Sequence, residues 1–389
     1  MPHLNTVFSQ LTQHINWDVF NELVDKHGTD YRTRRCSSRS QFLAILYGQL
    51  SGASSLREIE LGLRSHENCL YHAGAKFVAR STLSDANSSR SWRLFADMFV
   101  HMVQSGGRRS RRALGEGIRI LDASVIKLNG LSADWARFSK DSVAAKLHVV
   151  YDPETDCPVR ADITRCNVND IKAAELLDIK AGKTYVFDLA YYSYSWWAEI
   201  VKTGARFVTR LKSHTRLREV YEQPIDKTQN TVLYDKIGYL PQRLAWSRRN
   251  PMDMPVREIG VRLETGKTIR IVSNDIESSA MQIAELYKTR WKIELFFKWI
   301  KQNLKIKHFI GTSENAIKIQ IYVALIAFLI LRQAQRHQKS IKRTIAFTRL
   351  VRINLMHRRN INHLIQPEQP PPENSKQMRL NLEKSLTGQ

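Results

Sequence analysis

The sequence predicts an α/β core preceded by an all-helical region, and three observations support this fold class. Residues 114–216 show three strand patterns followed by helix, strand, helix and strand, an alternation typical of α/β domains. Residues 1–104 show apolar residues at helical spacing, broken by Gly and Ser. Residues 105–113 between them are rich in Gly, Ser and Arg, which indicates a flexible basic linker and a domain boundary.

The core elements are expected where the hydrophobic period changes between two and 3.6 residues. The expected strands are 117–121, 144–151, 159–164, 183–187 and 205–209, and the expected helices are 169–177 and 194–203. Residues 217–275 contain short strand patterns between turn-rich pieces, so we expect a β-rich insertion there. The core would resume in residues 276–335, with helices from about residue 279 and over 317–333.

The C-terminal region is strongly basic. The chain of 389 residues has a formal net charge of +23, and residues 280–389 contain 20 Lys plus Arg against six Asp plus Glu. Such an excess favours a polyanionic partner. We expect a basic helical region over 336–365 and a Pro-rich, disordered tail over 366–389.

A membrane is disfavoured as that partner. The longest uninterrupted apolar run, 323–331, has nine residues, whereas a spanning helix needs about 20. The first residues lack the basic and apolar regions of an export signal. The four cysteines show no zinc spacing and no disulfide framework. These features predict a cytoplasmic protein with reduced thiols.

One stretch, residues 287–301, combines the side chains expected of a phosphate-handling site. If it forms one helix, Tyr287, Arg290, Glu294 and Lys301 fall within a stripe about 60° wide. A solvated, salt-bridged helix face is the alternative interpretation. The sharper interpretation is a metal-binding glutamate flanked by cations that hold phosphate oxygens.

Two aspartates could complete such a site. Asp122 ends the first core strand and Asp188 ends a later one. Together with Glu294 they could hold two Mg²⁺ ions about 3.5–4 Å apart, because hard cations prefer oxygen ligands. An aspartate at the end of a strand can also be a simple cap or turn former, so both interpretations stay open at this point.

The order and spacing of these residues resemble a known family. Tyr287-x2-Arg290-x3-Glu294-x6-Lys301 is similar to the Tyr-Arg-Glu-Lys signature of bacterial insertion-sequence transposases of family four, a branch of the DDE transposases. The segments around Asp122 and Asp188 resemble the first two catalytic blocks of that family. The Gly often found two residues after the second aspartate is Ala190 here. The resemblance covers residues 115–335.

The resemblance implies an RNase H-like core, a mixed sheet flanked by helices, that cuts and rejoins DNA. Asp122, Asp188 and Glu294 would be the catalytic metal ligands for Mg²⁺, with Mn²⁺ able to substitute. Tyr287, Arg290 and Lys301 would contact phosphates of the transposon end. The resemblance further implies binding of terminal inverted repeats, cleavage through a hairpin intermediate, insertion into target DNA and a homodimer in the DNA complex.

Two tryptophans are candidates for stacking on an unpaired base, Trp291 beside Arg290 and Trp246 in the insertion, although ordinary packing would also explain them. Residues 80–84, followed by Arg90, could begin a short DNA-reading helix in a helical N-terminal DNA-binding domain. The alternative functions are an RNase H-like nuclease without strand transfer and a non-catalytic DNA-binding regulator.

Overall fold

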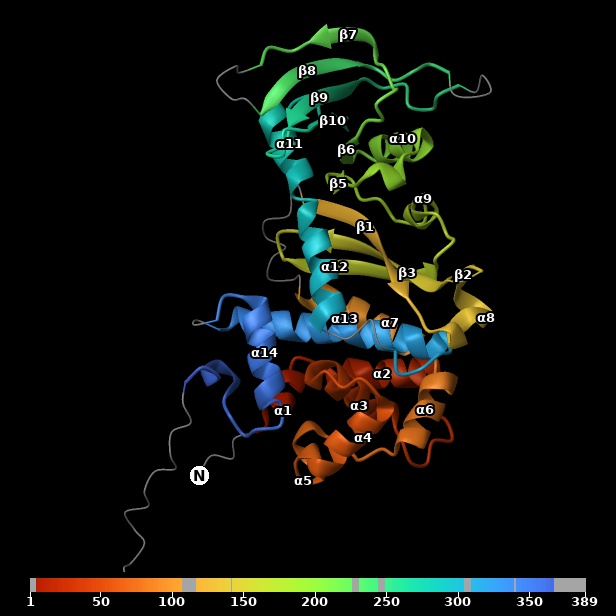
Figure 1. The fold of residues 1–389 in the computed structure, drawn as a ribbon, viewed down its shortest axis with the longest axis vertical. Coiled ribbons are helices and arrows are strands. Elements are labelled where there is room, and N and C mark those ends of the chain that lie inside the picture. The colour runs from red at the N-terminus through yellow and green to blue at the C-terminus, as the bar shows by residue number, and fades with distance from the viewer. Residues whose placement is uncertain are drawn as a thin grey trace, which may run out of the picture.

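The computed structural model describes residues 5–106, 117–140, 142–225, 231–243, 249–303, 309–338 and 341–366. Helices lie at one end of an elongated molecule and a mixed sheet extends from them (Figure 1). The helical N-terminal region is confirmed. Its elements are α1 (Val7–Thr12), α2 (Trp17–His27), α3 (Ser38–Ser51), α4 (Leu56–Ser65), α5 (Glu67–Leu70), η1 (Tyr71–Ala73), α6 (Arg80–Ser89) and α7 (Arg93–Gly106).

The predicted order of core elements is present, with a short excursion after the first strand. That excursion contains η3 (Gly130–Ser132), α8 (Ala133–Ala136) and β2 (Arg137–Ser139), which the sequence reasoning missed. The core itself consists of β1 (Ile118–Lys127), β3 (Ser142–Asp152), β4 (Cys157–Arg165), α9 (Asp170–Ala174), β5 (Thr184–Val186), η4 (Leu189–Tyr191), α10 (Tyr194–Lys202) and β6 (Arg206–Arg210). α9 is shorter than the helix expected over 169–177.

The sheet joins antiparallel and parallel strands. β4 pairs with β3 and β3 with β1, both antiparallel. β1, β5 and β6 are parallel neighbours, which requires crossover connections such as the one through α10. This mixed sheet with flanking helices fits an RNase H-like core. Beyond β6 the sheet continues with four antiparallel strands, in the order β10 (Thr268–Ser273), β9 (Val256–Arg262), β8 (Val232–Tyr239) and β7 (Arg218–Glu222).

Within the described part of the chain, the last strand is followed by the helices α11 (Ala280–Lys288), α12 (Trp291–Asn303), α13 (Glu314–Arg336) and α14 (Thr344–Asn354). α11 begins where expected, because Ser279 and Gln282 form a reciprocal capping box. The expected basic helical region is mainly α14, followed by the short turn η6 (Ile361–His363). The Pro-rich tail from residue 367 lies outside the described residues, as does most of the expected linker.

The long helix α13 is the centre of the core. Its 23 residues are long and apolar enough to cross a membrane, but 83% of the most apolar window is buried inside the protein. A helix that is apolar on all sides belongs in a core, and α13 is covered by α7, α3, α14 and strand β4. Tyr322 of α13 stacks on Trp92 and donates a hydrogen bond to the Ala161 carbonyl of β4. α13 therefore connects the N-terminal helices to the sheet.

Candidate active site

Asp122 and Asp188 hold matching positions on two neighbouring parallel strands. The β1–β5 register pairs Ile118 with Thr184 and Ile120 with Val186, a constant separation of 66 residues. Asp122 and Asp188 have the same separation and lie just beyond the last pair. Because side chains alternate between the faces of a sheet, both aspartates follow Ile120 and Val186 to the same face.

One expectation about Asp122 is wrong. β1 does not end there but runs on to Lys127, because residues 120–127 continue to pair with β3 after the pairing with β5 has stopped. The Asp122 carboxylate accepts a hydrogen bond from the Ala123 N–H at 2.8 Å. The Asp188 carboxylate accepts one from the Ala190 N–H at 2.9 Å and so caps η4. Asp122 thus lies within a strand, and Asp188 lies at the point where its strand has ended.

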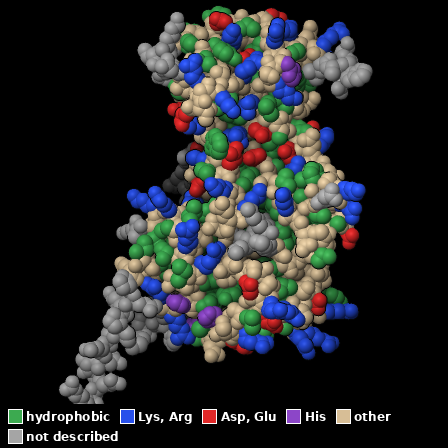
Figure 2. All heavy atoms as spheres, in the orientation of Figure 1, with side chains coloured by type: hydrophobic (Ala, Val, Ile, Leu, Met, Phe, Trp, Pro, Cys, Tyr) green, Lys and Arg blue, Asp and Glu red, His purple; other side chains and the backbone are tan. Residues whose placement is uncertain are grey.

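The Asp122 carboxyl is held in an environment unfavourable to its charge. Burial raises its pKa from 3.8 to about 6. The Ala123 N–H and Arg290 act in the opposite direction, while the negative charges of Asp188 and Glu294 raise the pKa further. The three predicted acidic residues therefore act on one another electrostatically. Figure 2 shows Asp and Glu side chains gathered near the middle of the molecule, close to where α11 passes into α12.

The predicted single helix over 287–301 is in fact two helices. α11 ends at Lys288 and α12 begins at Trp291. At the junction the Thr289 hydroxyl donates to the Leu286 carbonyl at 2.6 Å, and such back-bonding bends helices. The Arg290 N–H bonds the Tyr287 carbonyl three residues back, a tighter turn than in an α-helix. Tyr287 and Arg290 therefore precede the helix that carries Glu294 and Lys301.

Arg290 lies beside Glu294, four residues further along the chain. Its guanidinium contacts the Glu294 carboxylate at 2.7 Å, and its side chain is 15% exposed. Burial disfavours the charged guanidinium, but Tyr287, Glu294 and Asp122 outweigh it and raise the pKa of Arg290. The buried Arg290 Nε has no hydrogen-bond acceptor among the described residues. A strongly cationic group with a spare donor therefore adjoins the carboxylates.

Tyr287 forms the inner wall of this cluster. Its side chain is buried, and the Arg290 guanidinium lies over its ring at 5.8 Å from the centroid. Burial raises the pKa of the Tyr287 phenol, Arg290 and Arg210 lower it, and Asp188 raises it. Arg210 is the last residue of β6 and was missed by the sequence reasoning. The sequence predicts strand β6 but not its position beside β5, so it could not show that Arg210 lies near Tyr287.

Lys301 lies two helical turns beyond Glu294. Its ammonium donates to the Val125 carbonyl in the second half of β1 at 3.0 Å. α12 is therefore tied along β1, with Glu294 near Asp122 and Lys301 further down the strand. Trp291 is 60% exposed at the start of α12, whereas Trp246 lies outside the described residues.

Comparisons with known proteins identify the family. The family described as transposase DDE domain matches residues 113–330. A transposase, y4zB, from Sinorhizobium fredii is 39% identical over 75% of this chain and 81% of its own length. The chain belongs to the DDE transposases of bacterial insertion sequences. It is therefore an enzyme that cleaves and transfers DNA, as the sequence predicted.

Further comparisons differ in sequence identity and in how much of the chain they cover. A transposase of insertion sequence element IS5377 from Geobacillus stearothermophilus is 28% identical over 65% of this chain and 66% of its own length. Residues 3–76 match a domain of unknown function. A piggyBac transposase synaptic complex with hairpin DNA, solved by cryo-EM, covers 94% of this chain and 81% of its own at 11% identity. Its TM-score of 0.44 is too low to support an inference about this chain.

DDE transposases use divalent metal ions, so the fit of these carboxylates to such an ion matters. Among the described residues, no three His, Cys, Asp or Glu side chains stand close enough together to hold one ion. The Glu294 carboxylate is instead paired with the Arg290 guanidinium at 2.7 Å. The donor set nevertheless suits a hard cation, since all three side chains offer oxygen and a divalent charge would relieve the repulsion felt by Asp122.

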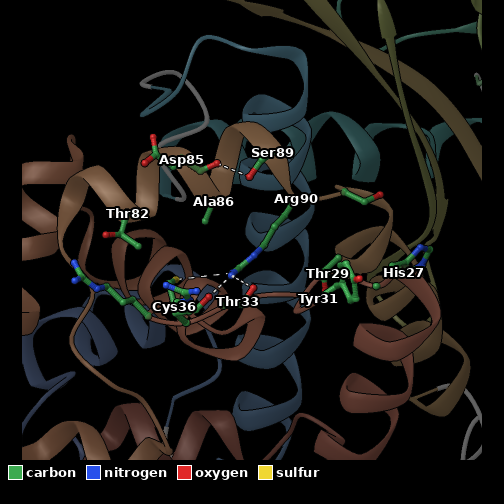
Figure 3. A pocket seen from close by; sticks show the side chains of 14 residues that line it. His27, Thr29, Tyr31, Thr33, Cys36, Thr82, Asp85, Ala86, Ser89 and Arg90 are labelled. Atoms are coloured by element: carbon green, nitrogen blue, oxygen red, sulfur yellow. Dashed lines mark hydrogen bonds between the residues drawn. The ribbon is translucent and has the colours of Figure 1, made fainter.

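The N-terminal helices of the transposase contain a polar pocket of about 500 Å³ between α6 and the loop after α2. Figure 3 shows Arg90 crossing it toward Thr33 and Cys36. Arg90 also donates to Gln41 at 3.1 Å, so it anchors the loop and does not present its charge to solvent. Arg34 and Arg35 of that loop are exposed. The exposed positive charge at this pocket therefore comes from the loop.

Proposed function

We propose that Asp122, Asp188 and Glu294 form the catalytic triad of this transposase and hold two Mg²⁺ ions, for which Mn²⁺ can substitute. The observation that carries this proposal is the matched register of Asp122 and Asp188 on parallel strands, with Glu294 near enough to raise the Asp122 pKa. When bound, the ions would activate the attacking oxygen and stabilise the leaving oxygen of an in-line displacement at phosphorus.

The Arg290–Glu294 ion pair gives the site two arrangements. In the structure the guanidinium engages Glu294 at 2.7 Å. For Glu294 to join Asp122 and Asp188 as a metal ligand, its carboxylate has to leave Arg290. The freed guanidinium, with its spare Nε–H donor, can then hold a phosphate oxygen of the transposon end. DNA binding and completion of the acidic triad would thus favour each other.

The remaining signature residues would position the end. Tyr287 supports Arg290 through ring contact, and Lys301 lies along β1 two turns from Glu294. Trp291, which is 60% exposed next to Arg290, is placed to stack on an unpaired base, and we assign the same role to Trp246. The hairpin intermediate, the assignment to family four and a homodimer that pairs two ends belong to the same proposal.

In this proposal the domains have the boundaries predicted from the sequence. Strands β7 to β10 would be the β-rich insertion of 217–275 into an RNase H-like core of 114–216 and 276–335. We assign the N-terminal helices to recognition of the terminal inverted repeats, and the enzyme to the cytoplasm, where nucleoid DNA is its substrate.

The helix α6 is the best candidate for that recognition. Its exposed face carries Ser81, Ser84, Asp85 and Ser88, small side chains that let a helix approach base edges. An α-helix with its side chains is about 10–12 Å in diameter, which fits a major groove about 12 Å wide, and the ten residues of α6 would extend about 15 Å along it. Exposed arginines flank it, Arg57 and Arg80 near its start and the Arg34–Arg35 loop near its end.

The test of the proposed function is an assay with an oligonucleotide that carries the element's end joined to flanking DNA. With Mg²⁺, the wild type should release the end and join its 3′-hydroxyl to a second duplex, and Asp188→Asn should do neither while still binding the end. Release without joining would identify a nuclease. Unchanged function of Asp188→Asn would indicate a non-catalytic regulator.

A further inference from the structure

A second cationic surface lies beside the candidate active site, between α12, α13 and α14. It is a groove of about 870 Å³. Six cationic residues line it: Lys292, Lys298, Arg332, Lys342, Arg343 and Arg349. Asp156, also in its lining, is held by Arg332 at 2.7 Å. Figure 2 shows Lys and Arg side chains together with hydrophobic ones over α12 and α14. The groove therefore favours an anion with apolar parts.

The groove and the acidic cluster lie on neighbouring faces of α12. At about 100° per residue, Lys298, Gln302 and Leu295 lie roughly 40–100° around the helix from Glu294. Lys301, by contrast, falls on the Glu294 side and bonds β1. One helix thus presents the proposed catalytic glutamate on one side and the groove on the next. A polymer that passes the carboxylates can continue into the groove without leaving α12.

Two buried donors in the groove lack acceptors. The indole N–H of Trp299, a side chain 8% exposed, has no hydrogen-bond partner among the described residues, and neither has the Nε–H of Arg332. A buried donor without an acceptor costs free energy, so such groups often mark a ligand that supplies one. The cationic residues of the rim favour an acceptor-rich anion such as a phosphodiester.

The floor and edges of the groove are apolar and firm. Trp299 and Phe296 both pack edge-on against Phe328, with ring centroids 4.9 and 5.1 Å apart. Leu295 on α12 is 61% exposed and Ile345 on α14 is 46% exposed. Deoxyribose rings between phosphates present apolar faces of this kind. An alternation of cations and exposed aliphatic side chains therefore matches a sugar–phosphate backbone.

We propose that this groove binds the backbone of the target duplex, the DNA that receives the transposon end. The inference rests on the proposed strand transfer. Tyr287, Arg290 and Lys301 are assigned to the end and lie on the carboxylate side of α12. Joining two DNA segments at one set of carboxylates requires a second cationic surface within reach. The groove is such a surface, and none of the three residues assigned to the end lines it.

The experiment uses the full-length protein and two substrates. The groove variant replaces Lys298, Arg343 and Arg349, all exposed, with Glu, and a second variant replaces them with Gln in case the first does not fold. The control replaces Lys180, Lys202 and Lys267, exposed lysines outside the groove and the acidic cluster, with Glu. The Glu variant of the groove and the control change the net charge of the protein by the same amount, and the Gln variant changes it less.

Joining of a pre-cleaved end to a plasmid should fall at least about tenfold in the groove variants, since three phosphate contacts are removed. Release of the end from flanking DNA should stay within about twofold, as should both reactions of the control. Equal loss of end release would overturn the proposal, because the groove would then hold the end or its flank. Undiminished joining would also overturn it, and an acidic protein would become the better occupant.

A binding measurement separates this inference from the proposed chemistry. The binding partner is a plasmid without transposon ends, and every protein carries Asp188→Asn. The slope of the logarithm of the binding constant against the logarithm of the salt concentration should decrease in magnitude by about three when the three groove cations are removed. In the control it should decrease by less. That slope does not depend on catalysis. If the slope changes as expected but the wild type joins no DNA, the proposed strand transfer fails and the groove stands as a duplex-binding surface.

Discussion

Asp122 and Asp188 hold equivalent positions relative to the parallel strands β1 and β5. Each lies two residues beyond the last residue pair of these strands, Ile120 and Val186. The sheet itself therefore fixes the separation of the two carboxylates. Each accepts a hydrogen bond from a nearby backbone N–H, which limits its rotation. Two like charges held at adjacent strands repel, and the consequences of that repulsion can be measured.

The first prediction concerns stability without metal. The folded-state pKa of Asp122 is raised from 3.8 to about 6, so the folded protein binds this proton more tightly than the unfolded chain does. The contribution of this group to stability is therefore greatest below about pH 4, falls as pH rises to about 6, and stays low above it. Asp122→Asn, which carries no charge, should be more stable than the wild type at pH 8, by on the order of 1–3 kcal/mol.

Urea unfolding in EDTA at pH 8 and pH 4 measures this difference. The gap between variant and wild type should shrink toward pH 4, where both side chains are neutral in the fold. Asp134→Asn is the control, because Asp134 is exposed and lies outside the acidic cluster. A wild type as stable as Asp122→Asn at pH 8 would contradict the view that burial and the neighbouring negative charges disfavour the Asp122 carboxylate.

The sequence could predict much of this site, for physical reasons that differ from residue to residue. Asp188 was found because a buried strand ends just before it, and the 66-residue separation from Asp122 became meaningful only with the strand register. The end of β1 was misplaced because Asp122 interrupts an apolar run, yet pairing with β3 continues beyond it. The spacing of hydrophobic residues predicts which side chains are buried, but it does not predict which strand pairs with which.

The prediction of a single helix over 287–301 was wrong for a different reason. The segment contains no Gly or Pro to signal an interruption, and the hydrogen bond from the Thr289 hydroxyl to the Leu286 carbonyl at the junction cannot be read from the sequence. The Arg290–Glu294 contact survives because it is local, four residues apart. Arg210 could not be assigned from the sequence alone, since its relation to Tyr287 depends on the order of β5, β6 and α11 in space.

The second prediction concerns metal binding. Addition of Mn²⁺ or Mg²⁺ should raise the thermal midpoint of the wild type, because an ion bound only by the folded protein stabilises it by about 2.7 kcal/mol at 100 times its Kd. Asp188→Asn should lose most of this shift, whereas Asp134→Asn should keep it. Differential scanning fluorimetry without DNA suffices. A full shift in Asp188→Asn would place the ion elsewhere.

The third prediction follows from the ion pair between Arg290 and Glu294. Arg290→Gln removes a competitor for the Glu294 carboxylate and a positive charge near the acidic cluster, so the DNA-free protein should bind Mn²⁺ several-fold more tightly. The same variant should bind the transposon end more weakly, with a log–log salt slope reduced by about one. Titration calorimetry and filter binding report the two effects.

Opposite changes in metal and DNA affinity are the specific signature here. A variant that lost both would indicate general damage to the fold. Lys301→Ala provides the comparison, because Lys301 is a cationic residue of α12 and its ammonium bonds the Val125 carbonyl of β1. It should weaken end binding and its salt dependence while changing metal affinity less than Arg290→Gln does.

The fourth prediction tests α6. Ser84 lies on its exposed face, so Ser84→Glu should leave the fold intact and place a carboxylate against base edges and phosphates. Specific binding of the transposon end should fall at least about tenfold, a cost within the range for one spoiled base contact. Ser139→Glu, at an exposed serine of β2, is the charge-matched control. Footprints of equal strength for both variants would remove α6 from the interface.

The last prediction separates binding from chemistry at Glu294. Glu294→Gln keeps the size of the side chain and its hydrogen bonding to Arg290 but removes the charge that a divalent ion requires. End cleavage should fall by several orders of magnitude, while end binding should hold or rise slightly, because Arg290 loses its ionic partner and is freer to take a phosphate oxygen. Gel shift and single-turnover cleavage on the same labelled end measure both quantities, and retained cleavage would exclude Glu294 from the triad.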